Sequence, residues 1–214
     1  AKKLAQETKT ATPQDAFLAG LLSQIGRSAL AMAMPKEYAK VLQAASRVPR
    51  DLPNYERIGI GITYCGVGGH LLRSWGLPET LCHAVETFRD AESPETVLPE
   101  LAAILFVAER AADVLIGDDP TDSAEVARFV QAARQHFGLT NEQSGDVLRD
   151  ASRELQESRT LYELSGTARS QEDIESEVRE RITELGLAMH MENQTLVHRQ
   201  EELLRRATTD PLTS

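Results

Sequence analysis

The chain has 214 residues, a formal net charge of −10 at pH 7 and a sequence pI of about 5.0. This acidic balance disfavours a general nucleic-acid binder, which needs a basic face. Hydrophobic residues make up 41% of the chain, enough to build a core. No apolar run approaches the roughly 18 residues that cross a bilayer, so we expect no membrane span. Cys65 and Cys82 show neither metal nor redox spacing, which favours a reducing cytoplasm.

Helix signals dominate the first part of the chain. Residues 1–10 are typical of the end of a helix that begins earlier, in a longer protein. Thr12, Pro13 and Asp15 predict a helix start, as a cap, a first-turn proline and an acid at the positive end. The next residues, Phe17–Met34, are interpreted as one helix whose apolar stripe contains Leu18, Leu21, Leu22, Ile25 and Ala29.

Two further segments carry prolines or glycines. Pro35 is expected to open a helix to about Gln43, and Arg47–Tyr55, with two prolines, is expected to be a loop. Arg57–Trp75 holds five glycines, but no strand precedes them, so close helix packing is favoured over dinucleotide binding. Gly76 should stop this helix and Pro78 should start the next one.

The rest of the first 164 residues is also helical in pattern. Leu81, Val85 and Phe88 form a core face, and Leu98–Ile116 is apolar enough to be central. Ser123–Phe137 is amphipathic, and Thr140 with Gln143 matches a capping box that opens a helix to about Leu164. No segment alternates like a strand, so the predicted fold class is all-α.

Beyond Ser165-Gly166-Thr167 the composition turns to charges of both signs. From Gln171 to about Ala207, seam positions recur at alternating spacings of three and four, with polar Glu192 and Arg199 at two of them and apolar residues at the others, which is typical of a coiled-coil seam. A helix of about 36 residues would be roughly 54 Å long, too long for the remaining core. We therefore expect a homodimer through this helix rather than a solvated face on a packed helix, with the seam Val178, Ile182, Leu185, Met189, Leu196 and Leu203.

Three stretches resemble the HDOD family, a catalytically degenerate branch of the HD superfamily found in bacterial signalling proteins. They are Ala16–Ala29, Val67–Ala84 with its Trp-Gly-Leu-Pro sequence, and Leu101–Ala112. The resemblance implies an HD-like helical bundle over residues 1–166, without the helical part that usually precedes it. Residues 167–207 would be the signalling helix. Trp75 is expected to be a core anchor between the Phe17–Met34 helix and the helix starting at Pro78.

The last residues resemble the start of a GGDEF domain, the module that makes cyclic di-GMP. This resemblance covers residues 208–214 and rests on Asp210, Leu212 and Thr213 after a long helix.

The same HD resemblance implies a lost metal site. HD enzymes hold metal through a His-Asp pair, where this chain has Ser23 and Gln24. Tyr64 stands at a second histidine position, and Phe88 with Arg89 stands at a His-His pair. Glu109 is the one carboxylate that remains, and Arg89 would repel a cation. We therefore expect no metal, no cofactor and no catalysis. His70 and His83 lie near the cysteines but fit no zinc spacing.

The predicted function is a non-catalytic regulatory module that controls a C-terminal GGDEF output through a dimeric helix. The alternatives are a protein-interaction scaffold unrelated to cyclic di-GMP and, with less support, a metal-dependent phosphohydrolase. The helical surface could also bind a protein partner.

Overall fold

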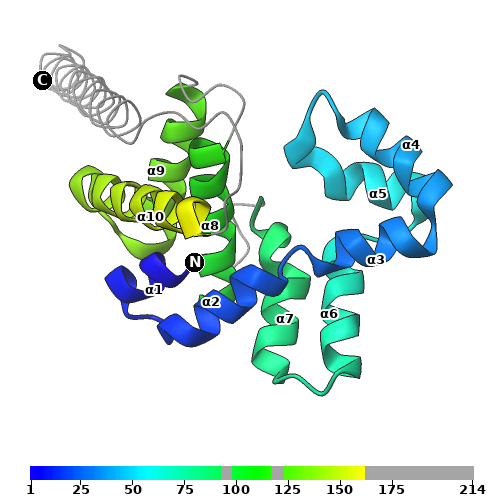
Figure 1. The fold of residues 1–214 in the computed structure, drawn as a ribbon, viewed down its shortest axis with the longest axis horizontal. Helices are drawn as coiled ribbons and strands as arrows, with labels where there is room; N and C mark the ends of the chain where they lie inside the picture. The colour runs from blue at the N-terminus through cyan, green and yellow to red at the C-terminus, as the bar shows by residue number, and fades with distance from the viewer. Residues whose placement is uncertain (93–97, 117–122, 162–214) are drawn as a thin grey trace, which may run out of the picture.

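The computed structural model is all-α, as the periodicity predicts. It describes residues 1–92, 98–116 and 123–161, and no strand occurs among them. The expected helix at 167–207 and the GGDEF-like residues 208–214 lie outside the described residues. The helices are α1 (Lys2–Thr8), α2 (Pro13–Leu22), α3 (Ile25–Ala33), α4 (Pro35–Ala45), α5 (Leu52–Ile60), α6 (Tyr64–Ser74), α7 (Glu79–Thr87), α8 (Glu100–Ile116), α9 (Ser123–Phe137) and α10 (Asn141–Leu161), with short 3₁₀ turns at Pro49–Asp51 and Phe88–Glu92 (Figure 1).

Helix α8 stands between two apolar clusters. One cluster joins α8 to α1, α9 and α10, with Phe129 and Leu148 among its buried residues. The other joins α8 to the helices from α3 to α7, with Tyr64 and Phe88 inside it. In Figure 1 these groups lie on opposite sides of α8. The nearly continuous apolar sequence of α8 follows from this position, because such a helix must bury more than one face.

Capping residues set several helix ends as expected. The Thr12 hydroxyl accepts a hydrogen bond from the Asp15 N–H at 3.1 Å and caps α2. The capping box is reciprocal: Gln143 N–H donates to Thr140 Oγ1, and Thr140 N–H donates to Gln143 Oε1. Gly138 ends α9 in the left-handed conformation with φ 66°.

The segment Phe17–Met34 is not one helix, which corrects the prediction. It divides into α2 and α3 at Ser23 and Gln24, and Ser23 Oγ donates to the Gly20 carbonyl at 2.8 Å. A serine hydroxyl that bonds back to the preceding turn competes with helix continuation. The predicted stripe is also wrong within α2, since Leu21 is exposed whereas Ala16 and Ala19 are the residues that are buried.

Two other boundaries differ from expectation. Arg47–Tyr55 is not all loop, since α5 begins at Leu52 with Pro53 in its first turn. Arg57–Trp75 is not one helix, since Gly61, with φ 78°, ends α5 before α6 begins. Both boundaries have a local cause, because a proline suits the first turn of a helix and a glycine readily takes the left-handed conformation that ends one.

One segment of the described chain passes the length and composition test for a membrane-crossing helix. It is Pro13–Ala33, with 21 residues and a mean hydropathy of 1.3, so the expectation that no run reaches this length is wrong on that measure. The structure divides the segment into α2 and α3 and buries Ala16, Ala19 and Leu30 in it. Because the core helix of a soluble fold passes the same test, this is weak evidence for a span.

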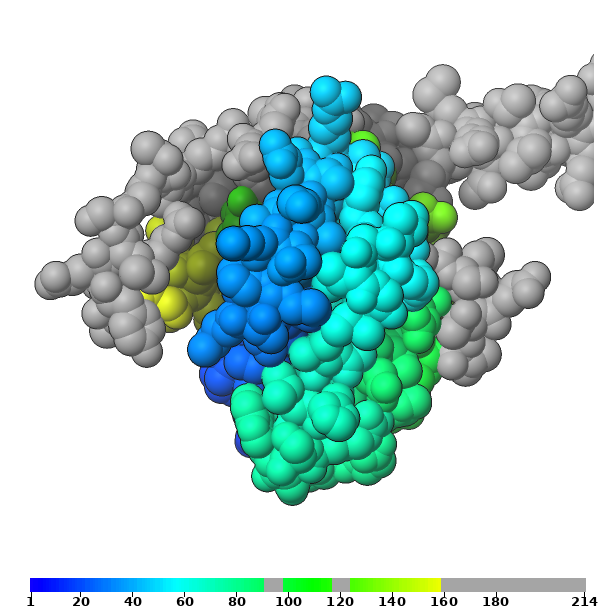
Figure 2. All heavy atoms as spheres, turned by 90° about the vertical axis from the view of Figure 1, so that its right-hand side faces the viewer, coloured from blue at the N-terminus to red at the C-terminus, as the bar shows by residue number. Residues whose placement is uncertain are grey.

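Trp75 is not a core anchor. Its side chain is 57% exposed, in the turn between α6 and α7 that lies at the lower end of the molecule in Figures 1 and 2. Leu72 on α6 and Leu81 on α7 are instead buried in the same apolar cluster. The prediction failed because an apolar side chain at a helix end can point either inward or outward, and the sequence pattern does not distinguish the two.

Candidate functional site

The six positions of the degenerate HD pattern converge where α2, α3, α6, α7 and α8 meet. Ser23 and Gln24 stand at the α2–α3 break, Tyr64 begins α6, and Phe88 and Arg89 follow α7. Ser23, Gln24, Phe88 and Glu109 line the same groove. The structure therefore places residues far apart in the sequence around one junction.

An internal ion pair stands at this junction. Arg89 Nη1 lies 2.8 Å from Glu109 Oε2, with both side chains largely buried. Arg89 also donates to the Tyr64 hydroxyl at 3.2 Å and to the Arg50 carbonyl at 3.0 Å. A guanidinium is always charged and fixes several acceptors at once, so it holds Glu109, Tyr64 and the α4–α5 connection in one network.

Aromatic packing and burial make the surroundings of Tyr64 poor for proton transfer. The rings of Tyr64 and Phe88 meet edge-on with centroids 6.3 Å apart. Burial raises the pKa of Tyr64 far above its usual range and raises the pKa of the adjacent Cys65 thiol to about 12. A general base or a nucleophile works best with a pKa near the working pH, so neither side chain is suited to those roles at neutral pH.

A buried carboxylate that the sequence did not reveal lies beside this network. Glu56 on α5 is fully buried, and it accepts a hydrogen bond from the Tyr38 hydroxyl at 2.8 Å and from the Tyr64 N–H at 2.7 Å. The second bond caps the start of α6. Desolvation raises the pKa of Glu56, although both hydrogen bonds oppose the shift. Nothing in the local sequence separates Glu56 from an ordinary surface glutamate.

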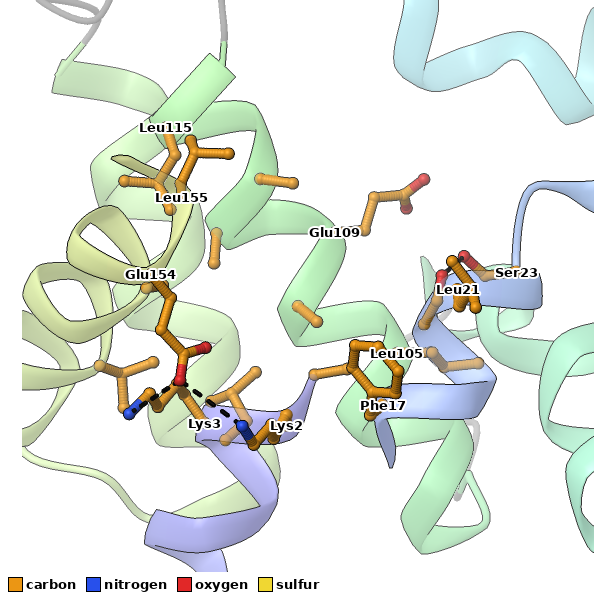
Figure 3. A pocket seen from close by; sticks show the side chains of 18 of the residues that line it. Lys2, Lys3, Phe17, Leu21, Ser23, Leu105, Glu109, Leu115, Glu154 and Leu155 are labelled. Atoms are coloured by element: carbon orange, nitrogen blue, oxygen red, sulfur yellow. Dashed lines mark hydrogen bonds and ion pairs between the residues drawn. The ribbon is translucent and has the colours of Figure 1, made fainter. Parts of the chain in front are cut away.

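The groove itself is open and mostly apolar, with a volume of about 780 Å³. Figure 3 shows Phe17 and Leu21 on one wall, Leu155 on the other, and Glu109 and Ser23 at one end. At the opposite end, Glu154 pairs with Lys2 and Lys3 at 3.6 and 3.3 Å and ties α1 to α10. The degenerate HD positions therefore form one end of a larger surface feature.

These residues do not fit the dinuclear metal site of HD enzymes. Such a site needs several histidine and carboxylate donors, and Glu109 is the one carboxylate among the six positions. Its charge is already matched by Arg89, which would repel a divalent cation. Within the described ranges, no group of three or more His, Cys, Asp or Glu side chains could hold a metal ion.

Comparison with known protein families gives a match over part of the chain. Residues 1–91 match the family model described as HDOD domain. The match covers less than half of the 214 residues but includes two of the three resembling stretches, and it supports a relationship of this part of the chain to the HD superfamily. The third stretch, Leu101–Ala112, lies outside it. No curated protein and no solved structure matches the chain.

Proposed function

We propose that residues 1–166 form a non-catalytic regulatory domain. The observation that carries the proposal is the Arg89–Glu109 ion pair at positions where HD enzymes hold metal ligands. A buried guanidinium satisfies the remaining carboxylate permanently, so the scaffold keeps its shape without a metal. The HDOD match over residues 1–91 supports the same assignment.

The proposed output is a C-terminal GGDEF domain that begins near Asp210 and is reached through a helix over 167–207. Two GGDEF domains must face each other across two substrate molecules. A dimeric helix that changes register or tightness can control that geometry. This part of the proposal rests on the sequence pattern of residues 171–214.

Two measurements test the proposal. Elemental analysis of the purified protein should find no stoichiometric transition metal, and a generic phosphodiester should not be hydrolysed. One or more metals bound per chain through Glu109 and its neighbours would contradict it. For the output, the gene product that extends past Ser214 should synthesise cyclic di-GMP at a rate that changes several-fold when residues 1–161 are removed. Equal rates would show that the domain does not regulate the output.

A second candidate function is a protein-interaction scaffold, which the exposure of Trp75 favours. An indole that is 57% exposed on a tight turn is a typical interface anchor. If Trp75 binds a partner, Trp75→Ala should abolish capture of that partner while the unfolding free energy changes by less than about 1 kcal/mol. Trp75→Phe is the matched conservative variant and should keep part of the binding.

A further inference from the structure

The groove described above has the dimensions and lining of a site for one more helix. Its residues recur at helical spacing on three helices, so each helix presents a stripe to the same space. The floor is α8, the two walls are α2 and α10, and residues 1–4 line one end, as Figure 3 shows for Lys2 and Lys3. The three stripes are Phe17 and Leu21 on α2, Ala108, Ala112 and Leu115 on α8, and Ala151, Leu155 and Ser158 on α10.

The lining favours a helix over a small ligand. Ala108 and Ala112 on the floor are one turn apart, and small residues at that spacing let a helix backbone approach closely. Phe17, Leu21 and Ile116 are 57%, 67% and 62% exposed around the same opening. Large apolar side chains grouped at one opening mark an interaction surface, and a groove of this kind takes the apolar face of an amphipathic helix.

We propose that the occupant is the chain's own seam segment, Val178–Met189. This segment carries Val178, Ile182, Leu185 and Met189 at spacings of three and four, the stripe that a three-walled groove requires. On α10 the lining runs from Val147 to Ser158, or about 17 Å, and Val178 to Met189 also spans about 17 Å as a helix. The length of the segment therefore matches that of the groove wall.

The path of the chain supports this choice. The described part of α10 ends at Leu161, three residues after Ser158 on the groove wall. The residues between Leu161 and Val178 include Gly166 and reach up to about 50 Å when extended, far more than the return path needs. A tether of this length gives an effective concentration on the order of 1 mM, so even a weak groove contact would be populated.

The consequence is a competition that deepens the proposed regulatory function and rests on it. The same side chains can pack in the groove of their own chain or pair with a second chain, but not both. The groove-bound form is a monomer, and any input that fills or distorts the groove releases the seam for pairing. An input shifts the equilibrium between the groove-bound monomer and the paired dimer by as much as its affinity differs between these two forms.

The first test measures the dimer dissociation constant of the full 214-residue chain by sedimentation. Leu21→Asp places a charge on the exposed groove wall and should strengthen dimerisation by on the order of tenfold, because the competing site is lost. Ile58→Asp is the matched control: Ile58 is 86% exposed and is not part of the groove, so dimerisation should not change. An unchanged dissociation constant in Leu21→Asp, with an unchanged circular dichroism melt, overturns the proposal.

The second test does not depend on dimerisation. The double variant Leu21→Cys/Leu185→Cys is oxidised with copper phenanthroline at low protein concentration, where two thiols lose two electrons and two protons to form one disulfide. An intrachain link between positions 21 and 185 supports groove binding, and Ile58→Cys/Leu185→Cys should give none. Links only between chains would place a second copy at the groove and overturn the proposal. If the intrachain link forms but no dimer exists at any concentration, groove binding stands and the dimeric output helix fails.

Discussion

At the scale of single residues, Arg89 and Glu109 depend on each other. Arg89→Met would leave Glu109 largely buried without the guanidinium that faces it at 2.8 Å. Removing one partner of a buried pair costs about 3–5 kcal/mol, whereas replacing both can be nearly neutral. We therefore expect Arg89→Met to lower the unfolding free energy in urea by that amount, and Arg89→Met/Glu109→Leu to recover much of the loss. Equal stability of Arg89→Met and wild type would show that the pair is not structural.

Glu56 gives a prediction about pH. Its folded-state pKa is raised above the ordinary value of 4.5 by burial, so the folded protein keeps a proton that the unfolded chain releases. The contribution of Glu56 to stability is therefore full below about pH 4.5 and is lost as pH rises through the raised pKa. A glutamine can accept from the Tyr64 N–H and donate to the Tyr38 hydroxyl, so it keeps the geometry without the charge.

The corresponding measurement is urea unfolding of wild type and Glu56→Gln at several pH values. The stability of wild type relative to Glu56→Gln should fall as pH rises from about 4.5. Glu56→Ala is the control for lost hydrogen bonds, and it should be less stable than both at every pH because two buried donors lose their acceptor. A constant difference between wild type and Glu56→Gln would mean that the carboxyl does not titrate with folding.

The sequence could predict part of this site. The resemblance to HD enzymes singled out Ser23, Tyr64, Arg89 and Glu109, and the structure brings them to one junction. It could not predict Glu56, because its burial arises from Tyr38 and Tyr64, which are 18 and 8 residues away. The groove was missed for the same reason, since it is assembled from helices that only the fold brings together.

At the scale of elements, the contact of α3 with α6 depends on Gly26. A Cβ at Gly26 would lie 1.9 Å from the Tyr64 carbonyl oxygen and 2.8 Å from the Gly68 nitrogen. Both are backbone atoms of α6, so the steric clash can be relieved only if α3 and α6 move apart. We expect Gly26→Ala to destabilise the domain by at least about 3 kcal/mol, measured as the unfolding free energy.

Gly66 is the matched control for this prediction. It lies in α6, and a Cβ there would meet only the Thr63 hydroxyl at 3.4 Å. Gly66→Ala should therefore be neutral or stabilising by up to about 1 kcal/mol, the usual gain for alanine over glycine in a helix. If both variants behave alike, close approach of the backbones does not hold α3 against α6.

Helix starts were more predictable than helix continuity. The starts at Thr12, Pro35 and Thr140 are local, because a side chain or a proline ring fixes them within one turn. The break at Ser23 and Gln24 is different, because the apolar pattern runs through it and only the packing of α3 on α6 reveals the change of direction. Sequence periodicity therefore identified these residues as helical but did not reveal that they form two helices, α2 and α3.

At the scale of the whole molecule, α8 links the Arg89–Glu109 ion pair to the groove. Glu109 is held by Arg89, and Ala108 and Ala112 on the same helix line the floor of the groove. A change at the junction that shifts α8 would alter both the groove and the helix from which the C-terminal segment departs. Packed helices shift as rigid units, so a shift of α8 alone is enough to couple the Arg89–Glu109 ion pair to the groove.

The last prediction concerns the assembly. If Val178, Ile182, Leu185, Met189 and Leu196 form a seam, two chains should pair in parallel, since the two proposed output domains would have to emerge at the same end. Leu185→Asp would bury a charge without a partner, so it should weaken the dimer while leaving residues 11–164 folded. Glu184→Gln, next to it but off the seam, should change neither property. Light scattering with circular dichroism melts measures both, and an unchanged mass for Leu185→Asp at micromolar concentration would place the dimer interface elsewhere.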